Sequence, residues 1–247
     1  MRANALAVMA KAPLAGQVKT RLMPALSAEE AAALARALLL DQLRHLSAIA
    51  DADLYLAFAP AEERGLFQEL APPGFRLLPQ QGADLGARMA NVFDTLHAGG
   101  YRNMVLIGAD LAPVPWEIFA EAFALLDNQL QRVVFGPSRD GGYYLVGCNQ
   151  PAPRIFEGMS WSHGEVLAQA LAVLASLQIE AHLLPIWFDI DTVDDLRHLQ
   201  SVLNPALERA LSNTLLLLRR LNLDNKARGD EDRRSLALPP GTDGRDA

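Results

Sequence analysis

Cysteine is almost absent from this sequence: Cys148 is the single one among 247 residues. A disulfide needs two thiols and thiolate zinc sites need several, so both a disulfide framework and a thiolate metal site are excluded. An excess of positive charge is also absent, because 22 Lys and Arg residues face 29 Asp and Glu residues, for a net charge of −7. Nucleic-acid-binding domains usually carry a basic face, so we do not expect this chain to bind nucleic acid.

Long apolar runs are missing as well. The apolar run 5–10 stops at Lys11 and is shorter than the hydrophobic region of an export signal. Leucines cluster around residue 38, but Arg36 and Asp41 interrupt them. A membrane-spanning helix needs about 20 predominantly apolar residues in succession. We therefore expect a soluble, cytoplasmic protein without a membrane span.

Buried strand patterns alternate with amphipathic helix patterns along the chain. At 247 residues, 51% of them hydrophobic, the chain is long enough for one large α/β domain or two small ones with a sizeable core. Strands are expected at residues 5–10, 53–59, 103–107, 132–135, 143–146 and 181–184. Helices are expected from Ser27, near 62–70, from about 84 to 98, at 116–126, 164–177 and 194–202, and from Pro205. This order predicts a three-layer α/β/α fold around a mainly parallel sheet.

The domain is expected to end near residue 223. A last amphipathic helix is predicted over about 205–221. From about Asp224 onward, mixed charges, prolines and glycines leave little to bury. Residues 224–247 are therefore predicted to be a disordered tail.

The first candidate site is the loop Lys11–Leu22, which follows the first expected strand. Open α/β folds bind ligands at the carboxyl ends of their strands. Lys11, Lys19 and Arg21 place three cations in a glycine-containing turn, which suits a polyphosphate because Lys supplies a point charge and Arg a bidentate fork. The loop is not a P-loop, since Val18 stands where that motif needs its second glycine. The alternative is a solvated basic loop with exposed cations.

Carboxylates follow two later apolar runs. Asp110 comes shortly after the strand 103–107, and Asp191 lies in the acidic segment Asp189–Asp195. Both suit a magnesium or manganese ion at the edge of a sheet. The alternatives are that Asp110 only begins a turn, and that Asp191 or Thr192 only caps the following helix. The acidic segment also imitates a phosphatase nucleophile motif, but that motif normally opens its domain, so we reject this interpretation.

Two glycine-containing loops are further candidates. In the segment 136–147, Asp140 precedes two adjacent glycines that allow close backbone approach to a ligand, and its carboxylate can accept hydrogen bonds from sugar hydroxyls. Asp-Gly is also a strong hairpin signal, and both interpretations can hold together. The segment 80–88 opens a helix, whose N-terminus can hold an anion but usually needs only a cap.

Together these segments resemble a bacterial family of glycosyltransferases with the GT-A fold, some of which are associated with arsenosugar biosynthesis. The resemblance spans nearly all of residues 5–200. It rests on six ordered motifs: Lys11–Leu22, Gln80–Arg88, Gly108–Asp110, Gly136–Gly147, Trp161–Ser162 and Asp189–Leu196. The basic loop is also similar to the opening of nucleotidyltransferases, including guanylyltransferases that activate phospholactate.

The resemblance implies a single GT-A domain over residues 1–223, with a nucleotide-binding part at about 1–112 and an acceptor-binding part at about 113–203. It implies that Asp110 and Asp191 share one Mg²⁺ or Mn²⁺ ion, and that Lys19, Arg21 and Asp110 act in catalysis. The donor nucleotide is expected to contact Lys11, Gly16, Lys19, Arg21, Gln81, Gly82, Asp84 and Arg88. The acceptor or sugar is expected to contact Asp140, Gly141, Gly142, Tyr143, Trp161 and Ser162.

Two positions depart from the family pattern. Ala112 stands where the family has proline, and His163 stands where it has threonine. The sequence predicts a metal-dependent transferase that uses a nucleotide-activated donor and a small-molecule acceptor, with transfer of a sugar favoured. The alternatives are nucleotidyl transfer with release of pyrophosphate, and an inactive relative that only binds nucleotide. In every active case, Asp110 and Asp191 should face one cleft, within about 8 Å of each other when no metal is bound.

Overall fold

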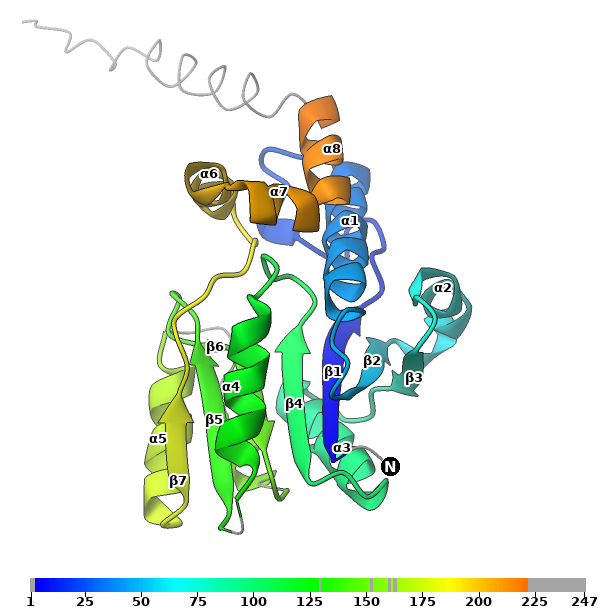
Figure 1. The fold of residues 1–247 in the computed structure, drawn as a ribbon. Coiled ribbons are helices and arrows are strands. Elements are labelled where there is room, and N and C mark those ends of the chain that lie inside the picture. The colour runs from blue at the N-terminus through cyan, green and yellow to red at the C-terminus, as the bar shows by residue number, and fades with distance from the viewer. Residues whose placement is uncertain (1–2, 129, 152, 160, 162–163, 222–247) are drawn as a thin grey trace, which may run out of the picture.

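The computed structural model describes residues 3–128, 130–151, 153–159, 161 and 164–221. Within these residues seven strands form one sheet in the order β3-β2-β1-β4-β6-β5-β7 (Figure 1). The strands are β1 (Asn4–Lys11), β2 (Asp53–Ala59), β3 (Phe75–Pro79), β4 (Asn103–Gly108), β5 (Arg132–Pro137), β6 (Tyr143–Cys148) and β7 (Glu180–Leu183). Of these described strands only β6 is antiparallel to its neighbours, so the predicted mainly parallel sheet is confirmed.

The pairing register brings three connections to the same edge of the sheet. β1 and β4 are parallel, with Met9 opposite Gly108, so the two strands end side by side. β6 runs the other way, with Leu145 opposite Ile107, so it begins at the edge where β4 ends. The loops after β1 and β4 and the turn before β6 therefore meet at the carboxyl edge of the parallel strands.

Helices cover both faces of the sheet. One face packs against α1 (Ala28–Leu46), α2 (Arg64–Leu70) and α4 (Trp116–Leu126), and the other against α3 (Leu85–Ala98) and α5 (Val166–Ser176). Alternation along the central strand explains the two cores, because Leu6 and Val8 belong to the first and Ala5 and Ala7 to the second. The predicted three-layer α/β/α architecture is confirmed. The described residues also contain three short 3₁₀ helices: η1 (Thr20–Leu22), η2 (Ala61–Glu63) and η3 (Pro153–Phe156).

A further group of helices lies beyond the carboxyl edge of the sheet (Figure 1). These are α6 (Val193–Val202), α7 (Pro205–Ala210) and α8 (Ser212–Leu221). A third core cluster attaches them to the N-terminal half of α1, and it contains Leu34, Leu38, Ile190, Leu199 and Leu211. The acidic segment that precedes α6 is therefore anchored to the same cluster.

The C-terminal helix expected over 205–221 is two helices. Asn204 caps α7 by accepting hydrogen bonds from two backbone N–H groups. The buried carboxylate of Asp41, in α1, caps α8 by accepting from the backbone N–H groups of Asn213 at 3.1 Å and Thr214 at 2.8 Å. These two separate caps explain the break at Leu211.

Two other expectations differ from the structure or fall outside it. Strand β3 was not expected, because its edge position leaves most of its side chains only partly buried and its sequence lacks a clear alternation. The predicted tail at 224–247 lies outside the described residues. No helix in the described part of the chain is both long and apolar enough to cross a membrane.

Candidate active site

The loop after β1 turns Lys19 into the protein. Lys19 adopts a left-handed backbone conformation, with φ 51° and ψ 34°, immediately before η1. Leu22 at the end of η1 is fully buried in the third core cluster and fixes the loop to the protein. As a result the Lys19 side chain is only 1% exposed, so the alternative of a solvated loop with exposed cations does not hold for this residue.

Asp110 and Asp191 are brought together by backbone pairing. The chain after β4 runs antiparallel to the segment before α6: Ile190 N–H donates to Asp110 O at 2.9 Å, and Ala112 N–H donates to Phe188 O at 3.4 Å. Asp110 and Asp191 thus end on the same side of the sheet edge. This placement agrees with the prediction that the two carboxylates face one cleft.

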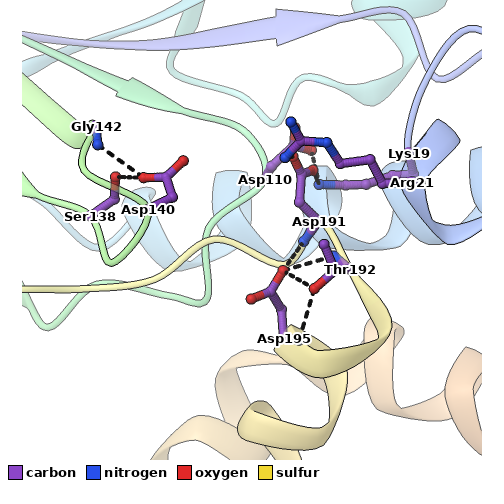
Figure 2. A network of polar contacts seen from close by, with 9 residues as sticks. All are labelled: Lys19, Arg21, Asp110, Ser138, Asp140, Gly142, Asp191, Thr192 and Asp195. Atoms are coloured by element: carbon purple, nitrogen blue, oxygen red, sulfur yellow. Dashed lines mark hydrogen bonds and ion pairs between the residues drawn. The ribbon is translucent and has the colours of Figure 1, made fainter. Parts of the chain in front are cut away.

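The ammonium of Lys19 joins the two carboxylates. Its Nζ lies 2.9 Å from Asp191 Oδ1 and 3.0 Å from Asp110 Oδ1 (Figure 2). Burial by itself lowers the pKa of Lys19, but the two neighbouring carboxylates more than offset this effect, so the pKa is raised and the amine stays protonated. Asp110 and Asp191 remain 52% and 37% exposed, so the ammonium lies on the protein side of the pair and the carboxylates lie toward solvent.

The other two cations of the basic loop differ from each other. The Arg21 side chain is 60% exposed, and its Nη1 lies 3.9 Å from Asp191 Oδ2, so it borders the pair from the solvent side. Lys11 is exposed, and its Nζ donates to Gln17 O at 2.9 Å, within the loop itself. Gly16 has φ 74° and forms the turn of the loop. A phosphate-facing role for Arg21 stays a prediction, whereas the Lys11 side chain donates within the loop and Gly16 shapes the turn of the loop.

The capping of α6 is carried by Thr192 and not by Asp191. Thr192 Oγ1 accepts from Asp195 N–H at 3.2 Å. Asp195 Oδ2 in return accepts from Thr192 N–H at 2.7 Å and from Asp191 N–H at 3.0 Å. This capping box leaves the Asp191 carboxylate to Lys19 and Arg21 (Figure 2).

The β5–β6 turn is the hairpin that its Asp-Gly-Gly sequence predicts. Asp140 Oδ1 accepts from Gly142 N–H at 3.0 Å and from the Ser138 hydroxyl, which closes the hairpin (Figure 2). Gly141 has φ 84°, and a Cβ there would lie 2.1 Å from Gly164 O, so a side chain has no room. The hairpin is confirmed, and Asp140 still lines the site from the side opposite Lys19.

These parts enclose a cavity of about 600 Å³ at the carboxyl edge of the sheet. Five charged residues of its lining, called the charged wall below, are Lys19, Arg21, Asp110, Asp189 and Asp191. The rest of the lining includes Leu85, Met89, Asp140, Gly142, Tyr143 and Trp161. Asp140 and Gly142 lie in the β5–β6 turn, apart from Lys19 and Arg21 (Figure 2). The cavity lining therefore contains the predicted metal ligands Asp110 and Asp191 and the cations Lys19 and Arg21. It also contains four predicted acceptor residues: Asp140, Gly142, Tyr143 and Trp161.

Several predicted donor-binding residues lie outside this cavity lining. They are Lys11, Gly16, Gln81, Gly82, Asp84 and Arg88. Asp84 caps α3 by accepting from Ala87 N–H at 2.8 Å, and Arg88 Nε donates to Gly82 O at 3.2 Å, so this segment has a structural role. A nucleotide-binding role for it stays a prediction. Gly141 is likewise absent from the lining, and Ser162 lies outside the described residues.

Asp189 is a site residue that the sequence reasoning did not assign. Its pKa is raised to about 6, mainly by burial and to a smaller extent by the Asp191 and Asp140 carboxylates, while its backbone hydrogen bond and Lys19 act in the opposite direction. Asp189 and Asp191 flank the fully buried Ile190. In an extended segment, side chains two residues apart share a face, so this spacing was the signal.

The carboxylate pair suits a metal ion whose remaining ligands are water or substrate phosphates. In the described part of the chain, no group of three or more His, Cys, Asp or Glu side chains is placed to hold a metal ion by itself. Asp110 and Asp191 nevertheless offer adjacent, partly exposed carboxylate oxygens. Mg²⁺ is usually held by one or two carboxylates, with water and substrate phosphates as its other ligands.

Comparison with known proteins places this chain in a family. The model of a family described as "Uncharacterized protein conserved in bacteria (DUF2064)" matches residues 42–163. A solved structure from Desulfovibrio desulfuricans G20, described as a "putative nucleotide-diphospho-sugar transferase", is 32% identical. Their alignment covers 93% of this chain and 98% of that one, with a TM-score of 0.83. The chain belongs to this bacterial family. No curated protein matches its sequence.

More distant structures of this fold are similar in architecture alone. A 4-diphosphocytidyl-2C-methyl-D-erythritol synthase is 13% identical, with a TM-score of 0.53 and coverage of 83% of this chain and 99% of that one. The synthase from Anaerococcus prevotii DSM 20548 is 9% identical, also at a TM-score of 0.53, with coverage of 81% and 96%. The fold inferred from the six motifs is thus confirmed as that of nucleotide-diphospho-sugar transferases.

The structure also explains how this family member accommodates its alanine at position 112. Ala112 is fully buried, its N–H donates to Phe188 O, and its carbonyl accepts from Trp187 Nε1 at 2.9 Å. A proline at this position would lack the donated hydrogen bond. Asp110 keeps its contact with Lys19 beside this alanine. His163, the other departure, lies outside the described residues.

Proposed function

We propose that this protein is a metal-dependent transferase that moves a sugar from a nucleotide-activated donor to a small-molecule acceptor. The proposal rests on the Asp110–Asp191 carboxylate pair, which has Lys19 on its protein side and Arg21 on its solvent side. This pair lies at the carboxyl edge of a fold shared with the Desulfovibrio protein. That protein's description concerns nucleotide-diphospho-sugar transfer. Within the single domain, residues up to about 112 would bind the nucleotide, and residues from about 113 to 203 would bind the acceptor.

The charged wall is suited to the leaving diphosphate. Asp110 and Asp191 would hold a Mg²⁺ or Mn²⁺ ion, which when bound supplies positive charge to the phosphate oxygens. The exposed guanidinium of Arg21 can form bidentate hydrogen bonds with the same phosphates. Together these groups stabilise the negative charge that develops as the donor bond breaks.

The rest of the cavity lining is suited to the sugar or the acceptor. One carboxylate oxygen of Asp140 is held within the β5–β6 turn, which orients the other. Trp161 packs close to α3: a Cβ at Gly86 would lie 2.9 Å from the indole, so only glycine permits this contact. An aromatic side chain and a carboxylate that line the same cavity suit a ring that carries hydroxyl groups, because its apolar face can stack while its hydroxyls donate.

Nucleotidyl transfer is the second candidate. It is favoured by the Arg21-containing loop, whose sequence is similar to nucleotidyltransferase openings, and by the shared fold of the diphosphocytidyl-methylerythritol synthase. In that case the acceptor attacks the α-phosphorus of a nucleoside triphosphate, and pyrophosphate leaves. Both candidates require the same charged wall, so the leaving group decides between them.

Product analysis tests the proposal. The protein is incubated with Mn²⁺ and either a panel of sugar nucleotides or the four nucleoside triphosphates, together with pooled small-molecule acceptors. Release of a nucleoside diphosphate that disappears in Asp110→Asn supports sugar transfer, and release of pyrophosphate supports nucleotidyl transfer. If the protein binds nucleotide but shows no metal-dependent turnover in either assay, both transfer reactions are contradicted. The alternative that remains is an inactive relative that only binds nucleotide.

A further inference from the structure

We propose that Lys19 is the resident cation of the Asp110–Asp191 pair and that a divalent metal has to compete with it for these carboxylates. The inference rests on the metal site of the proposed function, but it concerns a residue whose expected role was direct contact with donor phosphates. The geometry points elsewhere: both of its ion pairs are with the two proposed metal ligands.

The position of the ammonium supports this assignment. Nζ lies at hydrogen-bond distance from one oxygen of each carboxylate, so it bridges the pair as a metal ion would. The side chain is almost completely buried, whereas both carboxylates are partly exposed. Without this charge, two neighbouring carboxylates would repel each other. Lys19 therefore permits the pair to stay assembled when no metal is bound.

Charge explains why the lysine and the metal compete. With Lys19, the pair carries one net negative charge, whereas without Lys19 it would carry two. An ammonium in contact with both ligands also repels an incoming divalent cation. Lys19 lines the cavity, and its long side chain is flexible, so its ammonium can turn toward phosphate oxygens when a metal takes over the carboxylates.

Arg21 provides a matched comparison within the same loop. It is also a cation next to Asp191, but its closest approach is 3.9 Å, and its side chain is mostly solvated. Solvent screening makes such an exposed pair weak. A charge effect that is specific to the bridging position should therefore appear on removal of Lys19 and be much smaller on removal of Arg21.

The first test measures direct Mn²⁺ binding by electron paramagnetic resonance of free Mn²⁺, without any nucleotide. Wild type, Lys19→Met, Arg21→Met and Asp110→Asn are compared, and circular dichroism checks folding. We expect Lys19→Met to bind Mn²⁺ at least about tenfold more tightly than wild type, because it removes a unit charge in contact with both ligands. Arg21→Met should change the affinity far less, and Asp110→Asn should weaken it.

The second test uses the wild type, so it does not depend on the folding of a variant. The sequence has only three lysines, Lys11, Lys19 and Lys226, so reductive methylation can be followed at each by mass spectrometry. Lys19 should be protected in the metal-free protein and should react faster at saturating Mg²⁺. Lys11, which is exposed in the loop, serves as the internal control and should react equally in both conditions.

The outcomes separate this inference from the proposed function. If Mn²⁺ binds in an Asp110-dependent way but folded Lys19→Met shows equal or weaker affinity, the metal site stands and the competition is overturned. Unchanged protection of Lys19 at saturating Mg²⁺ also overturns it. If Mn²⁺ binding is absent from both wild type and Lys19→Met, the metal site of the proposed function fails, and the inference fails with it.

Discussion

Tyr143 and Tyr144 are adjacent on β6, but their hydroxyl groups have different surroundings. The Tyr144 hydroxyl donates to Pro185 O at 3.0 Å. The Tyr143 hydroxyl is buried at the cavity and has no hydrogen-bond partner among the residues that the structure describes. Burial raises the pKa of Tyr143, so its hydroxyl stays a neutral donor. A buried donor without a partner costs stability, and at a cavity wall it is available to a ligand.

Removal of each hydroxyl should therefore affect stability differently. Tyr143→Phe should leave the free energy of unfolding unchanged or raise it by up to about 1 kcal/mol, because it removes an unpaired polar group. Tyr144→Phe should lower it by about 0.5–1.5 kcal/mol, because it removes a hydrogen bond. Urea denaturation of both variants without ligand measures these changes. An equal loss in Tyr143→Phe would show that its hydroxyl has a partner in the native state.

At this scale the sequence predicted which residues meet but not how they are buried. Asp110 and Asp191 each follow an apolar segment, so their meeting at one edge followed from the topology of a parallel sheet. The burial of Lys19 did not follow, because it depends on a left-handed turn at a lysine and on the docking of Leu22. No local pattern in a loop with glycine, proline and three cations signals either feature.

At the scale of secondary structure, the carboxylate of Asp41 helps to hold the C-terminal helices α7 and α8 in place. Its carboxylate, fully buried on α1, accepts hydrogen bonds from two backbone N–H groups of α8 and from the Asn213 side chain at 2.8 Å. It also pairs with Arg44, which in turn donates to Arg209 O and Ala210 O at the end of α7. One buried carboxylate thus serves as the N-terminal cap of α8 and orients the arginine that binds the end of α7.

Asp41→Ala should lower the free energy of unfolding by about 3–5 kcal/mol, because the backbone N–H groups at the start of α8 lose their buried, charged acceptor. Asp194→Ala is the matched control: Asp194 also pairs with an arginine three residues later, but both side chains are exposed. Its loss should be below about 1 kcal/mol. Guanidinium denaturation of both variants measures the difference. Similar losses would show that the cap contributes little to the attachment of α8.

The same elements show where sequence patterns stop being informative. The strands next to the site were predicted because their apolar runs are buried on both faces and are therefore unambiguous. β3 was missed because an edge strand of five residues that contains an arginine and ends in proline carries little pattern. The division between α7 and α8 depends on Asp41, about 170 residues earlier in the chain, which no local window contains.

In the whole molecule, the site lies where the third core cluster meets the sheet. Phe188 and Ile190 belong to this cluster, and the carboxylates of Asp189 and Asp191 alternate with them. The packing of α1 and α6 to α8 therefore determines where Asp191 lies, although those helices contribute no side chain to the cavity lining among the described residues. Among the described residues, the second core, between the sheet and helices α3 and α5, contains no residue of the segment around Asp191.

Ile190→Ala and Leu96→Ala compare these two cores. Ile190 is 0% exposed and Leu96, in α3, is 1% exposed, so each substitution should lower the free energy of unfolding by about 2–5 kcal/mol. Ile190→Ala should also weaken Mn²⁺ binding several-fold, because the extended segment that aligns Asp191 with Asp110 loses its buried anchor. Leu96→Ala should leave Mn²⁺ affinity unchanged, because its cavity forms in a core that does not hold either carboxylate. Urea denaturation gives the first quantity, and Mn²⁺ titration at a temperature where both variants are folded gives the second. Equal Mn²⁺ affinities in the two variants would mean that backbone pairing alone positions Asp191, whatever the third core cluster contributes to stability.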